Sequence, residues 1–319
     1  LEQHCLEQHC RRDKWRELIM AVRERHLPSM GSSATVIVVG GTAPDIDHAV
    51  RRLHQLEARW SRFLPDSEVS RLNRLGGPAN VDLSRGLSND TATLLARAAE
   101  GFRISRGRFD PYRLAEVCDA GYAESRSNVG GPNGDRERST TAPRRGFDPG
   151  GIGKGLAADL VTGELIERGV AGALVSIGGD LRVRGESPHG ESWHIDIEDP
   201  RCADPVSRVR LDDGAVATSS QVKRRWSAAD GTVRHHLIDP STGTSADSPV
   251  LSSTVISAEA WQAEVLAKVT FLDAFGHSAV SEDTGLELVE SLGAAALVVT
   301  EGLELTTSRW ARYVCPVTA

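Results

Sequence analysis

The sequence predicts an α+β fold, with mixed or antiparallel sheets packed against helices. Two observations carry this prediction. Short strand-like runs cluster in the second half of the chain instead of alternating regularly with helices, and only a few segments show helical spacing of apolar residues. With 319 residues and 39% hydrophobic content, the chain can bury a sizeable core in one large domain or two. A disordered or fibrous protein is excluded.

The first half begins with a strand and a helix that covers it. Ala34–Val39 reads ATVIVV, which is typical of a strand, and Pro44–Phe63 carries apolar residues at the spacing of one buried helix face. Asn89–Ile104 has the same spacing and predicts a second helix. Between them, Ser61–Asn73 is polar and rich in turn formers.

The second half contains most of the expected strands. A helix is expected at about Glu259–Phe275, followed by a last strand at Ala294–Val299. The strands expected before that helix are Ala173–Ile177, Trp193–Ile197, Val206–Leu211, Ala215–Thr218, Val233–Ile238 and Ser253–Ile256.

Composition also suggests how the chain is divided. The opening ten residues repeat the pentapeptide LEQHC and are expected to lie outside the fold, whereas residues 125–145 are rich in Gly, Ser, Pro and charge and predict a surface loop or hinge. We therefore expect an N-terminal extension and one domain of two lobes, with boundaries at 1–27 for the extension, 28–319 for the domain, and about 28–124 and 146–319 for the lobes.

Charge and cysteine usage exclude several classes of protein. The net charge is −7 and no basic cluster alternates with aromatic residues, so no nucleic-acid partner is expected. No run approaches the roughly 18 apolar residues of a membrane-spanning helix. The five Cys show no CxxC motif and no paired framework, which favours a reducing compartment and predicts a cytoplasmic protein, unless a signal or lipoprotein leader has been removed.

A Gly-rich turn, Asp148–Gly155 (DPGGIGKG), precedes an expected helix. Glycines at a helix N-terminus let the backbone approach an anion such as a pyrophosphate, and Lys154 would add a positive charge. The segment matches neither a Walker loop nor a dinucleotide fingerprint, so a tight structural turn is the alternative. Lysine is rare in this chain: of 37 Lys and Arg, only Lys14, Lys154, Lys223 and Lys268 are Lys, which suggests that lysines are kept where a compact charge is needed.

Two further segments place polar residues at strand ends. Ser176–Asp180 (SIGGD) ends a strand with two glycines and an acid, a pattern typical of a turn. His235 and His236 are neighbours on a strand, so their side chains point to opposite faces and one of them faces the interior or a cleft. An inward histidine is more often a hydrogen-bonded core residue than a catalytic one.

Taken together, these segments resemble the ApbE family, the FAD:protein FMN transferases. The resemblance runs from about Pro28 to Trp310. Seven segments match in the family's order: Met30-Gly31, Ser61–Asn73, Gly107–Pro111, Asp148–Asp159, Gly178–Asp180, Ala217–Ser219 and His236–Gly243.

The resemblance implies a two-lobed α+β fold with a flavin cleft, and transfer of the FMN half of FAD to a Thr or Ser hydroxyl of an acceptor flavoprotein. FAD is then the substrate, Mg²⁺ the cofactor and AMP the leaving product. His236 is expected to help deprotonate the hydroxyl, with Asp239 as the alternative, and Lys154 to offset phosphate charge. The implied flavin contacts are Met30, Phe63, Arg108, Phe109, Asp110, Asp148, Lys154, His236 and Leu237.

The implied metal site departs from the family pattern. The family holds its metal with a carbonyl of the Gly-rich turn, here Gly151, and with an Asp and a Thr one helical turn apart; this chain has Glu264 and Lys268 at those two positions. A Glu can ligate Mg²⁺, but a Lys cannot. The resemblance therefore leaves two alternatives to transfer: a FAD-binding protein with weak or lost activity, and a hydrolase that yields FMN and AMP. We expect Lys268 to pair with Glu264 and face the cleft.

Overall fold

The computed structural model describes residues 21–75, 86–121, 146–222, 224–227, 231–276 and 283–315. The predicted loop at 125–145 and the opening pentapeptide repeat lie outside these residues. None of the helices in these ranges combines the length and apolar character needed to cross a bilayer.

The elements of the first part are β1 (Val22–Ser29), β2 (Ser32–Val39), α2 (Ala43–Trp60), α3 (Glu68–Arg74), α4 (Asn89–Ile104) and α5 (Leu114–Asp119). Those of the second part are η2 (Pro149–Gly151), α6 (Gly153–Glu167), β3 (Gly172–Ile177), β4 (Asp180–Gly185), β5 (Trp193–Glu198), β6 (Pro205–Leu211), β7 (Gly214–Ser220), β8 (Arg225–Ser227), β9 (Val233–His235), β10 (Val250–Ser257), α7 (Ala260–Asp273), α8 (Gly285–Ser291), β11 (Ala295–Thr300), β12 (Glu304–Thr306) and η3 (Ser308–Arg312).

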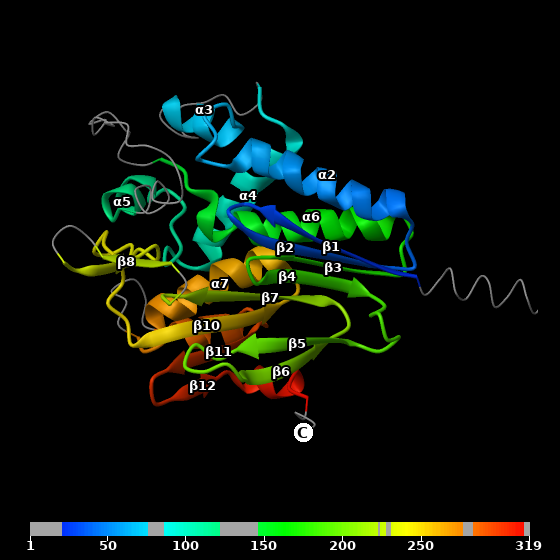
Figure 1. Cartoon of the computed structure of the whole chain (residues 1–319). Helices are drawn as coiled ribbons and strands as arrows, with labels where there is room; N and C mark the ends of the chain where they lie inside the picture. The colour runs from blue at the N-terminus through cyan, green and yellow to red at the C-terminus, as the bar shows by residue number, and fades with distance from the viewer. Residues whose placement is uncertain are drawn as a thin grey trace, which may run out of the picture.

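One antiparallel sheet of eight strands organises the fold, in the order β1-β2-β3-β4-β7-β10-β11-β12 (Figure 1). The predicted α+β class is confirmed. Pairing of β2 with β3 joins the two expected lobes in one sheet, and the expected domain start at residue 28 falls inside β1, so the sheet begins at Val22.

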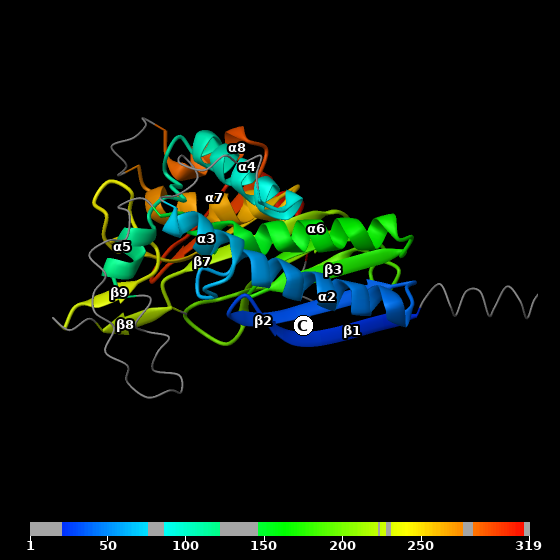
Figure 2. The same cartoon turned by 90° about the horizontal axis from the view of Figure 1, so that it is seen from above.

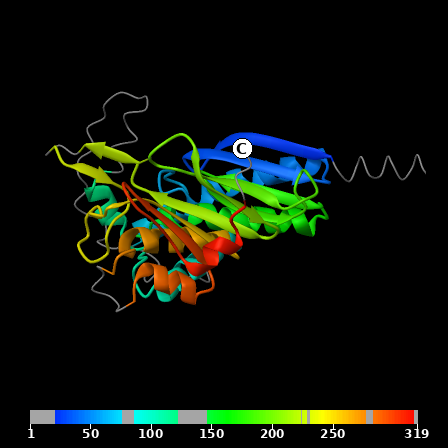
Figure 3. The same cartoon turned by 90° about the horizontal axis from the view of Figure 1, so that it is seen from below.

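The two faces of the sheet are buried in different ways. Helices α2, α6 and α7 lie along one face (Figure 2), where alternate side chains such as Val36 and Val175 join the main core. The other face carries the intervening residues, such as Leu174, and packs against Trp193 and Leu211 of the hairpin β5–β6, which is seen from below in Figure 3. This alternation follows from the two-residue period of a strand. The candidate site lies at one end of the helical layer.

Candidate active site

Two adjoining cavities lie where the Gly-rich turn meets the end of α2, the β1–β2 turn and α7. The first encloses about 800 Å³, including space open to solvent, and the second about 590 Å³. Both are lined by Gly150, Lys154, Arg224, His236 and Lys268, so they form one continuous site.

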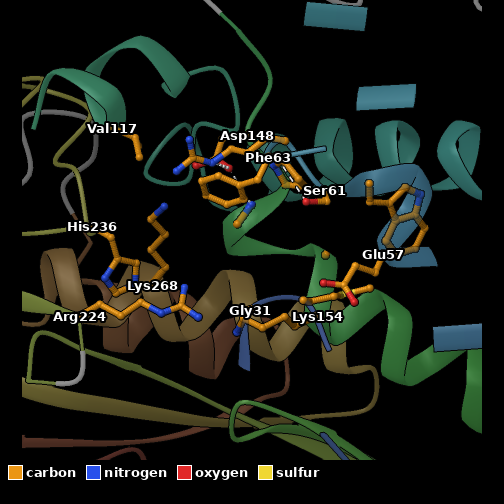
Figure 4. A pocket seen from close by; sticks show the side chains of 16 residues that line it. Gly31, Glu57, Ser61, Phe63, Val117, Asp148, Lys154, Arg224, His236 and Lys268 are labelled. Carbon is orange, nitrogen blue, oxygen red and sulfur yellow. Dashed lines mark hydrogen bonds and ion pairs between the residues drawn. The ribbon is translucent and has the colours of Figure 1, made fainter. Parts of the chain in front are cut away.

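The first cavity combines apolar and charged walls. Met30, Trp60, Phe63 and Val117 contribute apolar surface to it. Figure 4 shows His236, Arg224 and Lys268 together on one side of this cavity and Lys154 and Glu57 on the other. The second cavity is more polar and is bounded by Asp180, Thr218, Ser219 and Glu264, among others.

The Gly-rich turn forms as the sequence predicts. Asp148 caps η2 at its N-terminus, where its carboxylate accepts a hydrogen bond from Gly150 N at 3.1 Å, and α6 then starts at Gly153. This order places Lys154 in the first turn of α6, between the two cavities. The backbone N–H groups of that turn give the region a partial positive charge that suits an anion.

Helices α6 and α7 are held together by hydrogen bonds that involve the N-terminal turn of each. Asp159 of α6 accepts hydrogen bonds from Ala260 N and Trp261 N at the start of α7, at 2.8 and 2.9 Å. In return, Glu264 of α7 accepts a hydrogen bond from Gly155 N of α6 at 2.8 Å. A Cβ at Gly155 would lie 2.3 Å from the carbonyl oxygen of Ala260, so only glycine permits this approach.

Lys154 is held by two buried carboxylates. Its Nζ forms an ion pair with Asp180 and lies 3.2 Å from Glu264 Oε1, and both carboxylates are almost inaccessible. Burial lowers the pKa of Lys154, but the charges of Asp180 and Glu264 outweigh burial and hold it above the ordinary value. Lys154 therefore remains charged, and much of its charge is already balanced.

Glu264 lies in a setting that disfavours its ionised form. Burial raises its pKa to about 7; Lys154 opposes this shift, and the nearby charge of Asp180 adds to it. Its Oε2 accepts a hydrogen bond from Gly155 N, whereas Oε1 lies 3.2 Å from Lys154 Nζ but has no hydrogen-bond partner among the described residues.

Lys268 reaches the cavities from α7 but does not pair with Glu264, so the expected Glu264–Lys268 pair is wrong. Its Nζ lies over the ring of Phe109, 5.7 Å from the centroid, and against Gly151, where a Cβ would lie 3.3 Å from it. Among the described residues, no carboxylate comes within ion-pair distance of it. Burial lowers the pKa of Lys268, and the more distant charges of Asp148 and Glu264 offset this only in part.

The two neighbouring histidines have different environments. His236 lines both cavities, and burial together with the charges of Arg224, Lys268 and Lys154 lowers its pKa well below the ordinary value. It is therefore neutral near pH 7. His235 points the other way: its Nε2 donates to Ala246 O at 2.9 Å, and its Nδ1 accepts from Leu237 N at 3.3 Å.

Most residues singled out from the sequence meet at this site. Those that line at least one of the two cavities are Met30, Phe63, Asp148, Gly151, Lys154, His236, Leu237 and Glu264.

Neither cavity is lined by Arg108, Phe109 or Asp110, which lie behind the cavity walls. The buried Arg108 forms an ion pair with Asp273 at 2.6 Å, and Phe109 lies beneath Lys268. Asp110 accepts hydrogen bonds from Tyr112 N and Arg113 Nε, at 2.9 and 2.8 Å.

Asp239, the alternative base, also lines neither cavity. It shapes its turn by accepting from Ser241 N at 2.8 Å and from Ser241 Oγ at 2.7 Å. The structure thus leaves His236 as the base candidate of the two.

Two site residues escaped the sequence reasoning. Asp180 was recognised only as part of a glycine turn, although φ angles of +63° at Gly178 and +98° at Gly179 turn the chain so that Asp180 meets Lys154. Arg224 lines both cavities, yet no motif marks it, because its position depends on how β8 and β9 fold back.

The residues present do not fit a divalent cation. Glu264 Oε2 accepts from Gly155 N, Oε1 lies 3.2 Å from the Lys154 ammonium, and Lys268 supplies a second positive charge beside Gly151. In the described part of the chain, no three His, Cys, Asp or Glu residues come together as a metal site. Magnesium prefers several oxygen ligands and retained waters, so we assign no step of the chemistry to it.

Known proteins resemble the chain over much of its length. The chain is 29% identical over 261 residues to the FAD:protein FMN transferase of Vibrio cholerae, covering 76% of this chain and 75% of that one. It is 28% identical to the Treponema pallidum protein of the same name, covering 69% and 68%.

Solved structures share the fold. The ApbE protein of Thermotoga maritima superposes with a TM-score of 0.75 at 22% identity, covering 93% of this chain and 100% of that one. The flavinyl transferase ApbE of Pseudomonas stutzeri superposes with a TM-score of 0.70 at 26% identity, covering 92% and 96%. The model of the ApbE family matches residues 30–297, and the chain belongs to this family.

Proposed function

We propose that this protein is an FAD:protein FMN transferase that moves FMN from FAD to a Thr or Ser hydroxyl of an acceptor protein and releases AMP. The observation that carries the proposal is the continuous site, in which a cavity with both apolar and charged walls adjoins a second one lined mostly by polar residues and glycines, at Lys154 and His236. An elongated ligand with a flat apolar ring system and a diphosphate matches such a pair of cavities.

The apolar walls of the first cavity suit the flavin ring. Phe63 lies at its mouth, 42% exposed, with the Arg62 guanidinium 4.3 Å from its ring centroid. The diphosphate would lie toward the second cavity, near the N-terminus of α6 and the ammonium groups of Lys154 and Lys268. These groups offset negative charge without having to reorganise during the reaction.

The reaction needs one proton acceptor. The acceptor hydroxyl oxygen attacks the phosphorus atom of the FMN half, a new P–O bond forms, and the P–O bond to the AMP half breaks. His236 is neutral at pH 7 because its pKa is lowered, so it can take the hydroxyl proton. AMP leaves with the bridging oxygen and its negative charge.

The test replaces this proton acceptor without removing the cavity wall. His236→Gln should slow AMP release about 10²–10⁴-fold, the usual contribution of a general base, while calorimetry with FAD shows little change in affinity. His54→Gln is the matched control, because His54 is exposed on α2 and lines neither cavity.

The products distinguish the alternatives. AMP release together with flavin fluorescence on a Thr-containing acceptor supports transfer. AMP without a labelled acceptor indicates a hydrolase, and FAD binding without AMP indicates a binding protein. An equal loss of FAD affinity and rate in His236→Gln would assign His236 to binding instead of proton transfer.

A further inference from the structure

The two lysines of the site differ in how their charges are balanced. Lys154 is already paired with Asp180 and Glu264, whereas Lys268 has no carboxylate within ion-pair distance among the described residues. A partly buried ammonium without a close counter-charge is costly in a folded protein. Such a group is expected where a ligand supplies the missing negative charge.

The position of Lys268 is fixed by packing. Lys268 projects from α7, nearly all of whose residues are buried. Its ammonium lies next to the Phe109 ring and the backbone of Gly151. Lys268 lines both cavities at their junction. The ammonium is therefore held at the place where a diphosphate bridging the two cavities would pass.

We propose that Lys268 is a built-in cation that binds the FAD diphosphate in place of a divalent metal ion. The inference rests on the proposed function for the identity of the ligand. It also draws on the charge beside Glu264, since the only oxygen of this carboxylate that does not hold Gly155 N, Oε1, lies 3.2 Å from the Lys154 ammonium, which repels an approaching cation.

The test measures FAD binding by calorimetry, in EDTA and in millimolar Mg²⁺. For the wild type, the two affinities should agree within about twofold. Lys268→Met keeps the length of the side chain but removes the charge, and in EDTA it should weaken FAD binding roughly 10–100-fold, the expected loss for one charge-assisted hydrogen bond. Arg51→Gln is the control for net charge, because Arg51 is exposed on α2 and lines neither cavity.

The outcomes separate this inference from the proposed function. If the wild type binds FAD only when Mg²⁺ is present, the metal is required and the inference fails, although the proposed function stands. Wild-type affinity of Lys268→Met in EDTA also overturns it. If the wild type binds FAD under neither condition, the proposed function itself fails. A thermal melt of ligand-free Lys268→Met, with an unchanged or raised Tm, shows that a loss of affinity is not a loss of fold.

Discussion

Replacing Lys154 by methionine should destabilise the protein, because it leaves two buried carboxylates without their shared cation. At the 3.2 Å that separates Lys154 Nζ from Glu264 Oε1, two unit charges attract by about 5 kcal/mol at an effective dielectric constant of about 20. Removing the cost of burying Lys154 itself offsets part of this, so we expect a loss of about 3–5 kcal/mol, as for other broken buried pairs. The loss would appear as a lower Tm in a thermal melt.

The loss of Tm in Lys154→Met should increase as the pH rises. Burial raises the pKa of Glu264 to about 7 although Lys154 opposes the shift, so the pKa rises further in Lys154→Met. A group whose pKa is raised on folding stabilises the protein at low pH and less as pH rises through that pKa. The Tm deficit should therefore be small near about pH 5 and large near about pH 8.

Two comparison variants sharpen this test. Lys154→Met combined with Glu264→Gln should recover part of the lost Tm at high pH, because the amide oxygen can still accept from Gly155 N without carrying a charge. Lys268→Met should show no such deficit, since Lys268 lacks a close carboxylate. If Lys154→Met melts like Lys268→Met at every pH, the buried ion pair contributes no stability and the reasoning is refuted.

Two further predictions concern buried groups outside the cavities. Burial lowers the pKa of His235, although its hydrogen bond to Ala246 O opposes the shift, so stability should fall as pH drops below about 6.5, by at most about 1.4 kcal/mol per pH unit. Tm measured against pH should fall less steeply in His235→Gln, and an equal slope would contradict this. Arg108→Met should cost about 3–5 kcal/mol by breaking the buried ion pair with Asp273, which would lower the Tm. FAD affinity of the folded protein should stay at the wild-type value, and a selective loss of affinity would return Arg108 to the flavin site.

The elements that the sequence predicts well are those whose burial pattern is local. Asn89–Ile104 is helical over its whole predicted range, and α7 differs from the prediction only at its ends, because a buried helix face is visible as spacing along the chain. By contrast, β1 was missed: it is an exposed edge strand rich in charge, with no apolar alternation to reveal it. β4 was missed because the buried Arg182 interrupts its apolar pattern; that side chain lies 3.4 Å from Asp159.

In the site, too, the residues marked by local sequence patterns could be predicted and those set by long-range contacts could not. Lys154 and His236 are marked by local motifs, and both line the cavities. The pairing of Arg108 with Asp273 joins positions 165 residues apart, and Arg108 next to an aromatic and an acid resembles a ligand-binding motif as much as a buried ion pair. Spacing along the chain gives no information about such distant partners.

The reciprocal hydrogen bonds between α6 and α7 explain why Glu264 and Lys268 occur together at this site. Asp159 binds the N-terminus of α7, and Glu264 binds a first-turn N–H of α6 at Gly155, so each helix supplies a carboxylate to the other. In this contact Glu264 Oε2 is committed to Gly155 N, while Oε1 lies 3.2 Å from the Lys154 ammonium, so a positive charge already stands beside the carboxylate. Lys268 lies one helical turn further along α7 and is positioned by the same hydrogen bonds between the two helices. Helix packing thus sets the positions of both Glu264 and Lys268, and with them the charges that surround the site.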